Sequence, residues 1–152
     1  MYTLVDPQLH EEKITLAQLS TRSAYTLLYF YPKDDTPWCT LEAQEFTLLS
    51  DVFSKKWVQI VGVSRDSAKS HCAFISKYTL NAFYISDPEL TLHKQFGARG
   101  EKNNYGKIVQ SVIRSTVLLD NTWTIKKQRT NVRATGHAKR VAARIDENIP
   151  SS

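Results

Sequence analysis

Apolar and polar positions alternate along the chain in blocks that predict strands and helices in turn. Residues 26–31 (TLLYFY) and 57–64 (WVQIVGVS) are two short apolar runs of strand length, rich in β-branched and aromatic residues. The stretch between them has apolar residues at helical spacing, namely Leu41, Phe46, Leu49 and Phe53. The first part of the chain therefore predicts a strand, a helix and a second strand, which is a βαβ unit.

The middle of the chain continues this alternation. Residues 67–79 predict a helix, because Asp66-Ser67 is typical of a helix start. A strand is expected over 82–86. Asp87-Pro88 then predicts the start of another helix, which ends at Gly97.

Two strands and a helix are expected in the last third. The run 112–119 is almost continuously apolar except for Arg114, and 124–132 pairs with it across a turn that contains Asp120-Asn121. A last helix over 137–149 has apolar residues at helical spacing, namely Ala138, Val141, Ala142 and Ile145. The whole order predicts an α/β fold, in which a central sheet has helices on both faces.

Length and composition favour a soluble, single-domain protein. Residues 1–152 contain no internal repeat, low-complexity tract or Pro/Gly-rich linker. A chain of this size can bury roughly 70% of its unfolded surface, so its core needs neither metal nor disulfides. The apolar run 27–31 is much shorter than the ~18 residues of a membrane helix. The start has no basic segment and Lys13 is the first basic residue, so no secretory signal is predicted. With two separated cysteines, the expected location is cytoplasmic.

The net charge of +5 is unevenly distributed. Residues 1–98 carry 9 basic and 11 acidic side chains, whereas residues 99–152 carry 11 basic and 4 acidic ones. Seven basic residues of the last third are candidates for a nucleic-acid or membrane surface: Lys126, Lys127, Arg129, Arg133, Lys139, Arg140 and Arg144. They alternate with apolar residues, as exposed strand and helix faces do, and no aromatic residues interleave with them. We therefore expect a solvated basic surface, with neither nucleic acid nor a membrane as partner.

The candidate chemistry lies in residues 32–39 (PKDDTPWC), directly after the first strand. Thr36 suits a helix N-cap and Pro37 suits the first helical position, so Cys39 is expected in the first helical turn. Backbone N–H groups in that turn lack internal partners and favour a thiolate, which is the nucleophilic form of cysteine. We therefore expect Cys39 to be a reactive thiol.

A cation is also needed near this sulfur. The helix dipole contributes only about 0.3–1 kcal/mol, which is less than one pKa unit. Arg114 is the candidate, because it interrupts an apolar strand and an inward-facing arginine is costly unless it is paired. At this point the alternative, an arginine that reaches water from a strand end, remains open.

The run YFYPKDDTPWCT (29–40) resembles the active-site motif of the peroxiredoxins, in particular the bacterioferritin comigratory protein (BCP/PrxQ) subfamily. The spacing Pro-x-x-x-Thr-x-x-Cys is highly specific where it follows a strand and opens a helix. The resemblance extends over nearly the whole chain. Further matches are Glu42, Gly62-Val63-Ser64-Arg65-Asp66-Ser67, Ser86-Asp87, Gln95-Phe96-Gly97, and Arg114 before an apolar strand and Asp120.

The resemblance implies a thioredoxin-like fold with a central mixed sheet, and a thiol peroxidase that reduces hydrogen peroxide and organic hydroperoxides without metal or organic cofactor. Cys39 would be the peroxidatic nucleophile and form a sulfenic acid. Thr36 would hydrogen-bond the peroxide, Pro32 would shield the site from water, and Arg114 would stabilise the thiolate and the substrate oxygens. A thioredoxin or glutaredoxin-type protein would be the reductant, the role would be antioxidant defence and redox homeostasis, and a monomer is expected.

The second cysteine leaves two catalytic cycles open. Many PrxQ members have a resolving cysteine five residues after the first, where this chain has Gln44. Another subgroup carries it on the following helix, where Cys72 lies about one turn before the usual position. Either Cys72 resolves the sulfenic acid of Cys39, or Cys72 only packs and the enzyme works with one cysteine. A disulfide requires Cα atoms within ~7 Å, so the turn around Cys39 would unwind.

Other polar and aromatic residues are expected to have structural roles. Trp38, where the family usually has glycine, either covers the pocket, docks a partner or packs on a neighbouring loop, and we expect packing. His71 and His93 have no metal-ligand spacing with the cysteines and are expected on helix surfaces. Asp34 and Asp35 are adjacent on a loop, so we expect them to point apart as turn residues.

A second function class also fits the sequence. The chain would then be a thioredoxin-fold interaction protein with residual or lost peroxidase activity, and the basic C-terminal third would be its binding surface. Gln44 and Trp38 favour this alternative, whereas the complete motif around Cys39 favours the peroxidase.

Overall fold

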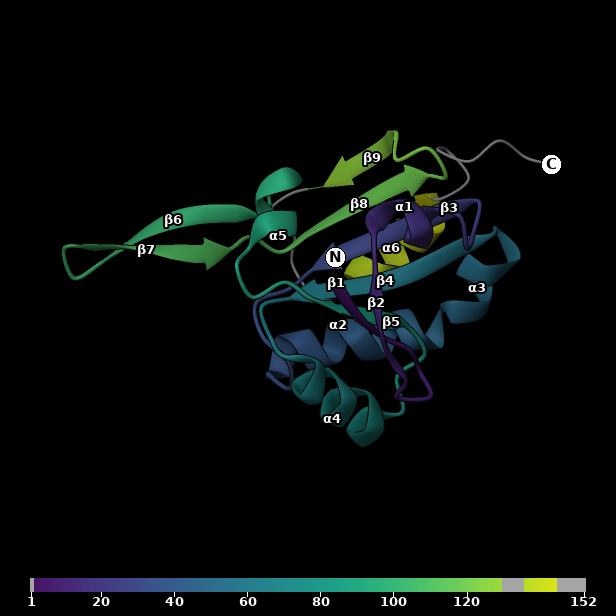
Figure 1. Cartoon of the computed structure of the whole chain (residues 1–152), viewed down its shortest axis with the longest axis horizontal. Helices are drawn as coiled ribbons and strands as arrows, with labels where there is room; N and C mark the ends of the chain where they lie inside the picture. Colours follow the sequence, from purple (N-terminus) through teal and green to yellow (C-terminus); the bar gives the residue numbers. More distant parts are fainter. Residues whose placement is uncertain (1, 130–135, 145–152) are drawn as a thin grey trace.

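The computed structural model describes residues 2–129 and 136–144. Seven strands form one sheet in the order β2-β1-β5-β4-β3-β8-β9, and β6 pairs with β7 in a second sheet (Figure 1). The strands are β1 (Tyr2–Val5), β2 (Glu11–Ile14), β3 (Tyr25–Phe30), β4 (Val58–Ser64), β5 (Phe83–Ser86), β6 (Arg99–Asn104), β7 (Lys107–Val112), β8 (Ser115–Asp120) and β9 (Ile125–Arg129). The helices are α1 (Leu16–Ser20), α2 (Pro37–Leu48), α3 (Ser50–Lys55), α4 (Ala68–Tyr78), α5 (Thr91–Gln95) and α6 (His137–Arg144).

The predicted βαβ unit forms the centre of the sheet. β3 and β4 pair in parallel, with Leu28 opposite Val61, and α2 and α3 connect them. β4 also pairs in parallel with β5, whereas β8 is antiparallel to β3, so the sheet is mixed as expected. Parallel strands that are covered on both faces read as continuous apolar runs, which explains why β3 and β4 were easy to predict. The loop from β3 to α2 leaves the sheet at the C-terminal ends of these strands.

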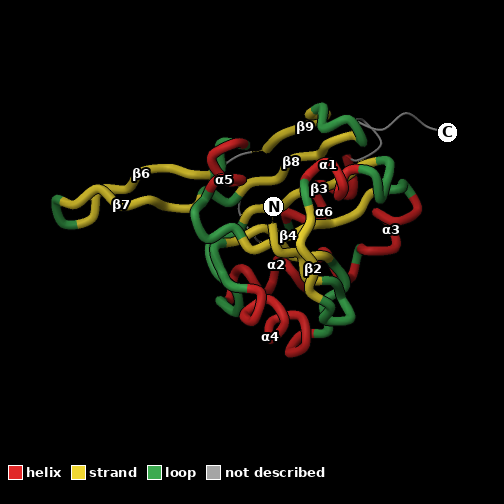
Figure 2. Tube along the Cα trace, in the orientation of Figure 1, coloured by secondary structure: helices red, strands yellow, loops and turns green. Residues whose placement is uncertain are grey.

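Helices cover both faces of the sheet, as the sequence predicts (Figure 2). On one face Phe46 of α2, Phe74 of α4 and Ala138 of α6 belong to one buried apolar cluster. On the other face Leu19 of α1 and Leu92 of α5 belong to a second cluster. Because successive β3 side chains alternate between the two clusters, both ends of this strand are fixed between two packed layers.

The other predicted elements are confirmed where the structure describes them. α4 begins after Ser67, whose hydroxyl accepts a backbone hydrogen bond as an N-cap does. β9 is antiparallel to β8, and α6 buries Ala138 and Val141. The remainder of the predicted strand at 130–132 and of the predicted helix at 145–149 lies outside the described residues.

Several elements were not predicted. β1, β2 and α1 occupy the N-terminal part of the chain, and β6 and β7 form a hairpin that extends away from the large sheet (Figure 1). β2 (EEKI) and β6 (RGEKNN) are mostly polar, so neither has the apolar alternation that signals a half-buried strand. Sheet edges and isolated hairpins are formed by backbone pairing, which composition does not report.

The helix expected from Asp87 starts later than predicted. α5 begins at Thr91, after Leu90, which has left-handed backbone angles with φ 60°. Asp87 is instead a side-chain acceptor: its carboxylate receives the Thr91 hydroxyl at 3.1 Å and the His93 backbone N–H at 3.0 Å. The acidic residue therefore holds this helix from a preceding turn and is not its N-cap.

The strand predicted over 112–119 is also corrected. β7 ends at Val112 and β8 begins at Ser115, so Arg114 lies in the short link between two strands. A residue in such a link is free of the strict in-and-out alternation of a strand. This explains how a cation is accommodated inside an otherwise apolar run.

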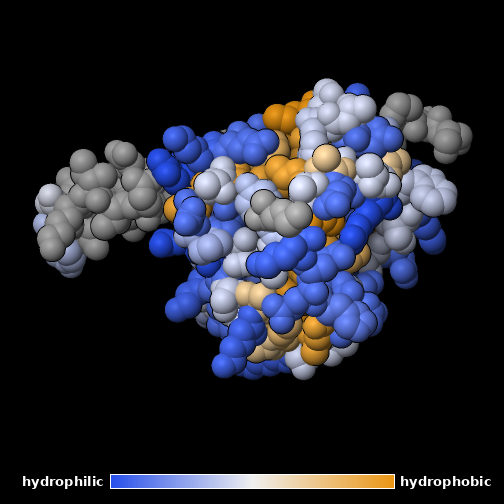
Figure 3. All heavy atoms as spheres, viewed as in Figure 1, coloured by the Kyte–Doolittle hydropathy of each residue, from blue (hydrophilic) through white to orange (hydrophobic). Residues whose placement is uncertain are grey.

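The visible face of the molecule is mostly hydrophilic, with smaller apolar areas between (Figure 3). Lys126, Lys127, Lys139 and Arg140 are exposed, as a solvated basic surface requires, and Arg129 is half-buried. Arg133 and the side chain of Arg144, which belong to the same predicted surface, lie outside the described part of the chain. Among the described residues, no helix has the length and apolar character that a membrane crossing requires.

Candidate active site

Cys39 lies in the first turn of α2, as predicted. The chain leaves β3 at Phe30, and the loop ends at Thr36, which has extended backbone angles in the N-cap position. Pro37 is the first helical residue, and the N–H of Thr40 donates to the Thr36 carbonyl at 2.8 Å. Cys39 is thus the third helical residue, where backbone N–H groups still lack carbonyl partners within the helix.

Thr36 occupies the N-cap position, but its side chain does not cap. The hydroxyl donates to the carbonyl oxygen of Lys33 at 3.0 Å, and no N–H of the helix binds it. Thr36 therefore has the predicted N-cap position, without a hydrogen bond from a helix N–H to its side chain. The helix amides that the hydroxyl leaves unbound stay available to a ligand.

Arg114 reaches the candidate nucleophile directly. Its Nη2 donates to the Cys39 Sγ at 3.1 Å, and its side chain is only 13% exposed. The prediction of an inward-facing arginine is confirmed, and the alternative of an arginine in water is wrong. Burial disfavours the charge, but Glu42 and Cys39 together hold the pKa of Arg114 above its ordinary value, so the guanidinium stays charged.

Glu42 is the second partner of this guanidinium. Arg114 Nη1 donates to Glu42 Oε1 at 2.6 Å, and the glutamate side chain is 1% exposed. Burial raises the pKa of Glu42 to about 7, against the lowering effect of the arginine charge. From the sequence, Glu42 was recognised only as part of a motif. Its position one helical turn after Cys39 was the signal that both side chains share one face.

Cys39 is enclosed by the core and by this ion pair. Its side chain is 2% exposed and belongs to the same buried cluster as Tyr29 and Ala43. Pro32, expected to shield the sulfur, is an exposed residue of the loop after β3. The arrangement brings together a buried sulfur, a charged donor and a carboxylate of adjustable charge.

Cys72 lies on α4, and both cysteines are free thiols. It is half-buried against the same core cluster, and its Sγ points to the Leu9 carbonyl at 4.0 Å. Burial raises the pKa of the Cys72 thiol, and the carboxylates of Glu11 and Asp6 raise it further. This thiol is therefore a poorer nucleophile at neutral pH than an unperturbed one.

Trp38 was expected to pack on a neighbouring loop, and this expectation is wrong. Its side chain is 62% exposed on the outer side of the first turn of α2. It lines a cavity of about 440 Å³ together with Leu41, Gln44 and Tyr78. Leu41 and Gln44 lie on the helix face opposite Cys39, so this cavity is outside the site that holds the sulfur.

The sequence suggested a surface position for His71, but this residue lies in the core. Its ring is 0% exposed, and its Nδ1 lies 2.8 Å from the Asp34 carboxylate while its Nε2 lies 3.0 Å from the Ile85 carbonyl. Asp34 also accepts hydrogen bonds from the hydroxyls of Tyr31 and Ser70. The loop between β3 and α2 is thereby anchored to α4 and β5.

Asp34 and Asp35 point apart, as predicted. Asp34 is buried in the network around His71, whereas Asp35 binds Lys77 and Tyr78 at the surface. Asp34 therefore does more than form a turn, since it connects the loop to the core.

His93 is also buried, with 0% exposure, which corrects the expected surface position. Its Nδ1 lies 2.6 Å from the Asp87 carboxylate. The periodicity of the sequence did not reveal the burial of the two histidines, because their acidic partners lie outside the helices that carry them. Among the described residues, no group of three or more His, Cys, Asp or Glu side chains could hold a metal ion.

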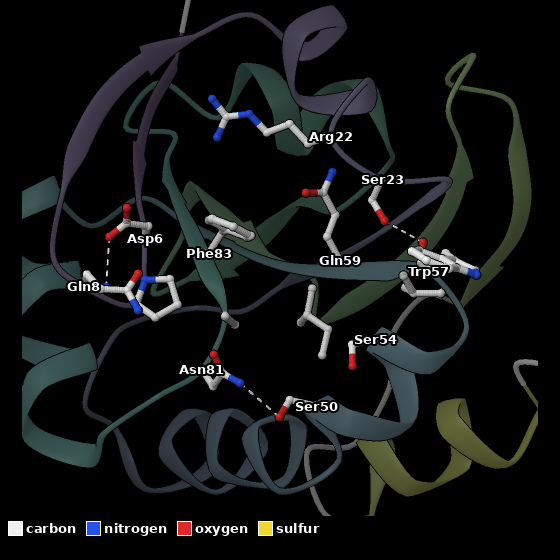
Figure 4. Close-up of a pocket in the computed structure, with 14 residues that line it drawn as sticks. Asp6, Gln8, Arg22, Ser23, Ser50, Ser54, Trp57, Gln59, Asn81 and Phe83 are labelled. Atoms are coloured by element: carbon white, nitrogen blue, oxygen red, sulfur yellow. Dashed lines mark hydrogen bonds between the residues drawn. The ribbon is translucent and has the colours of Figure 1, made fainter.

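A second cavity, of about 660 Å³, has Arg22, Gln59 and Asn81 among the residues that line it (Figure 4). It is lined by residues at the starts of β4 and β5, whereas Cys39 follows the C-terminal end of β3. Two of its polar side chains have partners within the lining: Asn81 donates to the Ser50 hydroxyl at 3.1 Å, and Ser23 donates to the backbone carbonyl of Trp57 at 2.6 Å.

Comparisons with known proteins place the chain in a family. Residues 3–128 match the model of the AhpC/TSA family. A putative peroxiredoxin bcp of Helicobacter pylori is 43% identical over 115 residues, 76% of each chain. Peroxiredoxin Bcp of Xanthomonas campestris is 40% identical over 121 residues, 80% of this chain and 76% of the relative. A solved structure of Xanthomonas campestris Peroxiredoxin Q has a TM-score of 0.84 at 35% identity and covers 95% of this chain and 89% of that one.

These matches cover the loop after β3, the first turn of α2 and the link that carries Arg114. They confirm the resemblance that the Pro-x-x-x-Thr-x-x-Cys spacing suggested, and with it the thioredoxin fold. The chain belongs to the AhpC/TSA family and, within it, to the Bcp/PrxQ peroxiredoxins, which are thiol peroxidases.

Proposed function

We propose that Cys39 is the peroxidatic nucleophile of a thiol peroxidase that reduces hydrogen peroxide and organic hydroperoxides. The observation that carries this proposal is the hydrogen bond of 3.1 Å from Arg114 Nη2 to the Cys39 sulfur. A charged guanidinium at this distance favours the thiolate, and the first turn of α2 adds unpaired N–H donors. We propose that residues 1–152 act as one catalytic domain.

The proposed reaction is a displacement at oxygen. The Cys39 thiolate attacks one peroxide oxygen, so an S–O bond forms while the O–O bond breaks. The departing oxygen takes a proton and leaves as water or an alcohol, and the sulfur becomes a sulfenic acid. Negative charge grows on the departing oxygen, where N–H donors of Arg114, the helix amides and the Thr36 hydroxyl stabilise it. Thr36 would rotate away from Lys33 to reach the substrate, and Pro32 would limit the access of water.

Glu42 fits this mechanism as the residue that orients the guanidinium. Its hydrogen bond of 2.6 Å fixes one Nη atom of Arg114, which leaves the other directed at the sulfur. A buried arginine with one partner would lose part of this alignment, because long side chains have several rotamers. The carboxylate therefore restricts Arg114 to the geometry in which Nη1 binds Glu42 and Nη2 binds the Cys39 sulfur.

We propose that an external thiol, from a thioredoxin or glutaredoxin-type protein, reduces the sulfenic acid. Its sulfur forms a mixed disulfide with Cys39 and releases water, and a second thiol then frees the Cys39 thiol. The raised pKa of Cys72 and its contact with the Leu9 carbonyl support a cycle with one cysteine. A reducing cytoplasm would supply such thiols, and a monomer suffices because one chain provides sulfur, guanidinium and carboxylate.

The test compares two single-cysteine variants. Cys39→Ser should abolish the consumption of hydrogen peroxide, whereas Cys72→Ser should keep the parent rate with thioredoxin as reductant. Trapping of a sulfenic acid at Cys39 by a mass-tagged nucleophile should succeed in the Cys72→Ser protein. Peroxide consumption that persists in Cys39→Ser contradicts the peroxidase proposal. A Cys72→Ser protein that reacts once and then stops contradicts the one-cysteine cycle and favours resolution by Cys72.

A further inference from the structure

A buried acid–base pair lies near Arg114 but does not touch the reacting atoms. Asp87 follows β5 and His93 lies in α5, and their side chains are 1% and 0% exposed. His93 Nδ1 lies 2.6 Å from Asp87 Oδ2, and the His93 backbone N–H donates to the same oxygen at 3.0 Å. Burial tends to raise the pKa of Asp87, but these hydrogen bonds hold it below its ordinary value.

Backbone hydrogen bonds connect this pair to the segment that carries Arg114. The His93 carbonyl accepts the N–H of Ala98 at 2.8 Å. The Ala98 carbonyl in turn accepts the N–H of Ile113 at 2.7 Å, and Ile113 directly precedes Arg114. The pair thus fixes the start of the β6–β7 hairpin and, through Ala98, its return to the sheet.

The His93 ring also contacts the strand that leads to Cys39. It packs edge-on against Phe30, the last residue of β3, with ring centroids 4.9 Å apart. Phe30 is opposite Ser115, the first residue of β8, whose hydroxyl donates to the Ile113 carbonyl at 2.8 Å. The His93–Phe30 contact therefore connects both sides of the active site, which are the Cys39 loop and the Arg114 link.

The ring of His93 is retained at an energetic cost. Its Nε2 is buried and has no hydrogen-bond partner among the described residues. A buried polar atom without a partner has a cost in stability. An apolar side chain would avoid this cost, so the bond from Nδ1 to Asp87 accounts for the presence of an imidazole.

We propose that the Asp87–His93 pair positions Arg114 against the Cys39 sulfur by fixing the backbone of Ala98 and Ile113. Neither residue touches substrate, so both are positioning residues. The inference deepens the proposed function and rests on it. A catalytic group that is displaced by about 1 Å can lose about 100-fold in rate, so a loosened Ile113 is enough to weaken the contact of 3.1 Å.

The experiment uses the full chain with Cys72→Ser, so that Cys39 is the only thiol. Asp87→Asn keeps the side-chain size and removes the charge, and His93→Gln removes the ring but keeps Asp87. Leu19→Ala is the matched control, because Leu19 is buried in the same apolar cluster as Leu92 of α5 but lies on α1. The measurements are melting temperature, thiolate absorbance at neutral pH and the rate of Cys39 oxidation by hydrogen peroxide.

We expect Asp87→Asn and His93→Gln to lower the oxidation rate about tenfold or more and to decrease the thiolate signal. Leu19→Ala should lower the melting temperature and leave both other readouts unchanged. If the two variants only lose stability, as the control does, the inference is overturned. If Asp87→Asn does not fold, His93→Gln alone decides. An Arg114→Gln protein distinguishes failure of this inference from failure of the proposed function. If Arg114→Gln does not slow the reaction, the proposed function itself is contradicted.

Discussion

Arg114 contacts two side chains with one guanidinium, and this sharing is the main feature of the site at the residue scale. Nη2 binds the Cys39 sulfur and Nη1 binds Glu42. Because the pKa of Glu42 is raised to about 7 by burial, the carboxylate changes its charge near physiological pH. Below that pH the positive charge of Arg114 acts mainly on the sulfur, and above it the charged Glu42 carboxylate also attracts the guanidinium.

The substitution Glu42→Gln should therefore change the pH dependence of the peroxide reaction. We expect the ratio of the variant rate to the parent rate to rise as pH increases through about 7, because only the parent gains a competing carboxylate. Stopped-flow measurement of Cys39 oxidation across this range gives the ratio. A ratio that stays flat through this range means that the Glu42 charge does not act on the sulfur.

Single residues were predictable where a sequence rule was broken. Arg114 was found because a charged residue interrupts an apolar run, and Cys39 because Thr and Pro mark the start of a helix. His71 and His93 were misplaced, because their burial depends on Asp34 and Asp87, and sequence spacing does not show that these side chains meet. Burial of a polar side chain is decided by its partner, which is a property of the tertiary structure.

At the element scale, α2 has an inner and an outer face with different roles. Phe46 and Cys39 point into the core, whereas Trp38 and Leu48 are exposed. The first turn carries the nucleophile on one side and the cavity of about 440 Å³ on the other. A change on the outer face should therefore leave both packing and chemistry intact.

Trp38→Ala tests this division of the helix. Because Trp38 is 62% exposed, we expect its removal to change the free energy of unfolding by less than about 0.5 kcal/mol and to leave the peroxide rate unchanged. Phe46→Ala on the same helix is the control and should cost about 3–5 kcal/mol, since Phe46 is fully buried. Denaturant unfolding gives both values. A large loss in Trp38→Ala would show that the exposed ring supports the turn around Cys39.

Elements were predictable in proportion to their burial. β3, β4 and α4 have continuous apolar runs or helical periodicity, and the sequence located them within a few residues. β2 and the β6–β7 hairpin are largely polar and were missed, and α5 was placed too early because Asp87 is typical of an N-cap. Tertiary hydrogen bonding, and not local preference, determines where these elements begin.

At the scale of the whole molecule, the residues of the proposed site lie at one end of the sheet. Parallel strands β3, β4 and β5 direct their C-terminal ends to the side of the Cys39 loop. The antiparallel β8 begins at this end of the sheet, and Arg114 directly precedes β8. Arg114 therefore lies at the same end as the Cys39 loop. The mixed topology of the sheet therefore brings together residues 75 positions apart in sequence.

The buried carboxyl of Glu42 should also affect the stability of the whole fold. Its pKa is raised from 4.5 to about 7 in the folded chain, so folding favours the protonated form. Its contribution to the free energy of unfolding is full below pH 4.5 and is lost as pH rises to about 7. We expect Glu42→Gln to gain stability relative to the parent across this window, by a few kcal/mol at most. Thermal unfolding at a series of pH values measures the gain, and a parallel decline of both proteins contradicts it.

The most direct test of the central claim is the ultraviolet absorbance of the Cys39 thiolate at neutral pH, measured in the Cys72→Ser protein with and without Arg114→Gln. We expect a clear thiolate signal with the arginine and loss of most of that signal without it. Equal signals in the two proteins, both as small as that of a free cysteine, would contradict this claim.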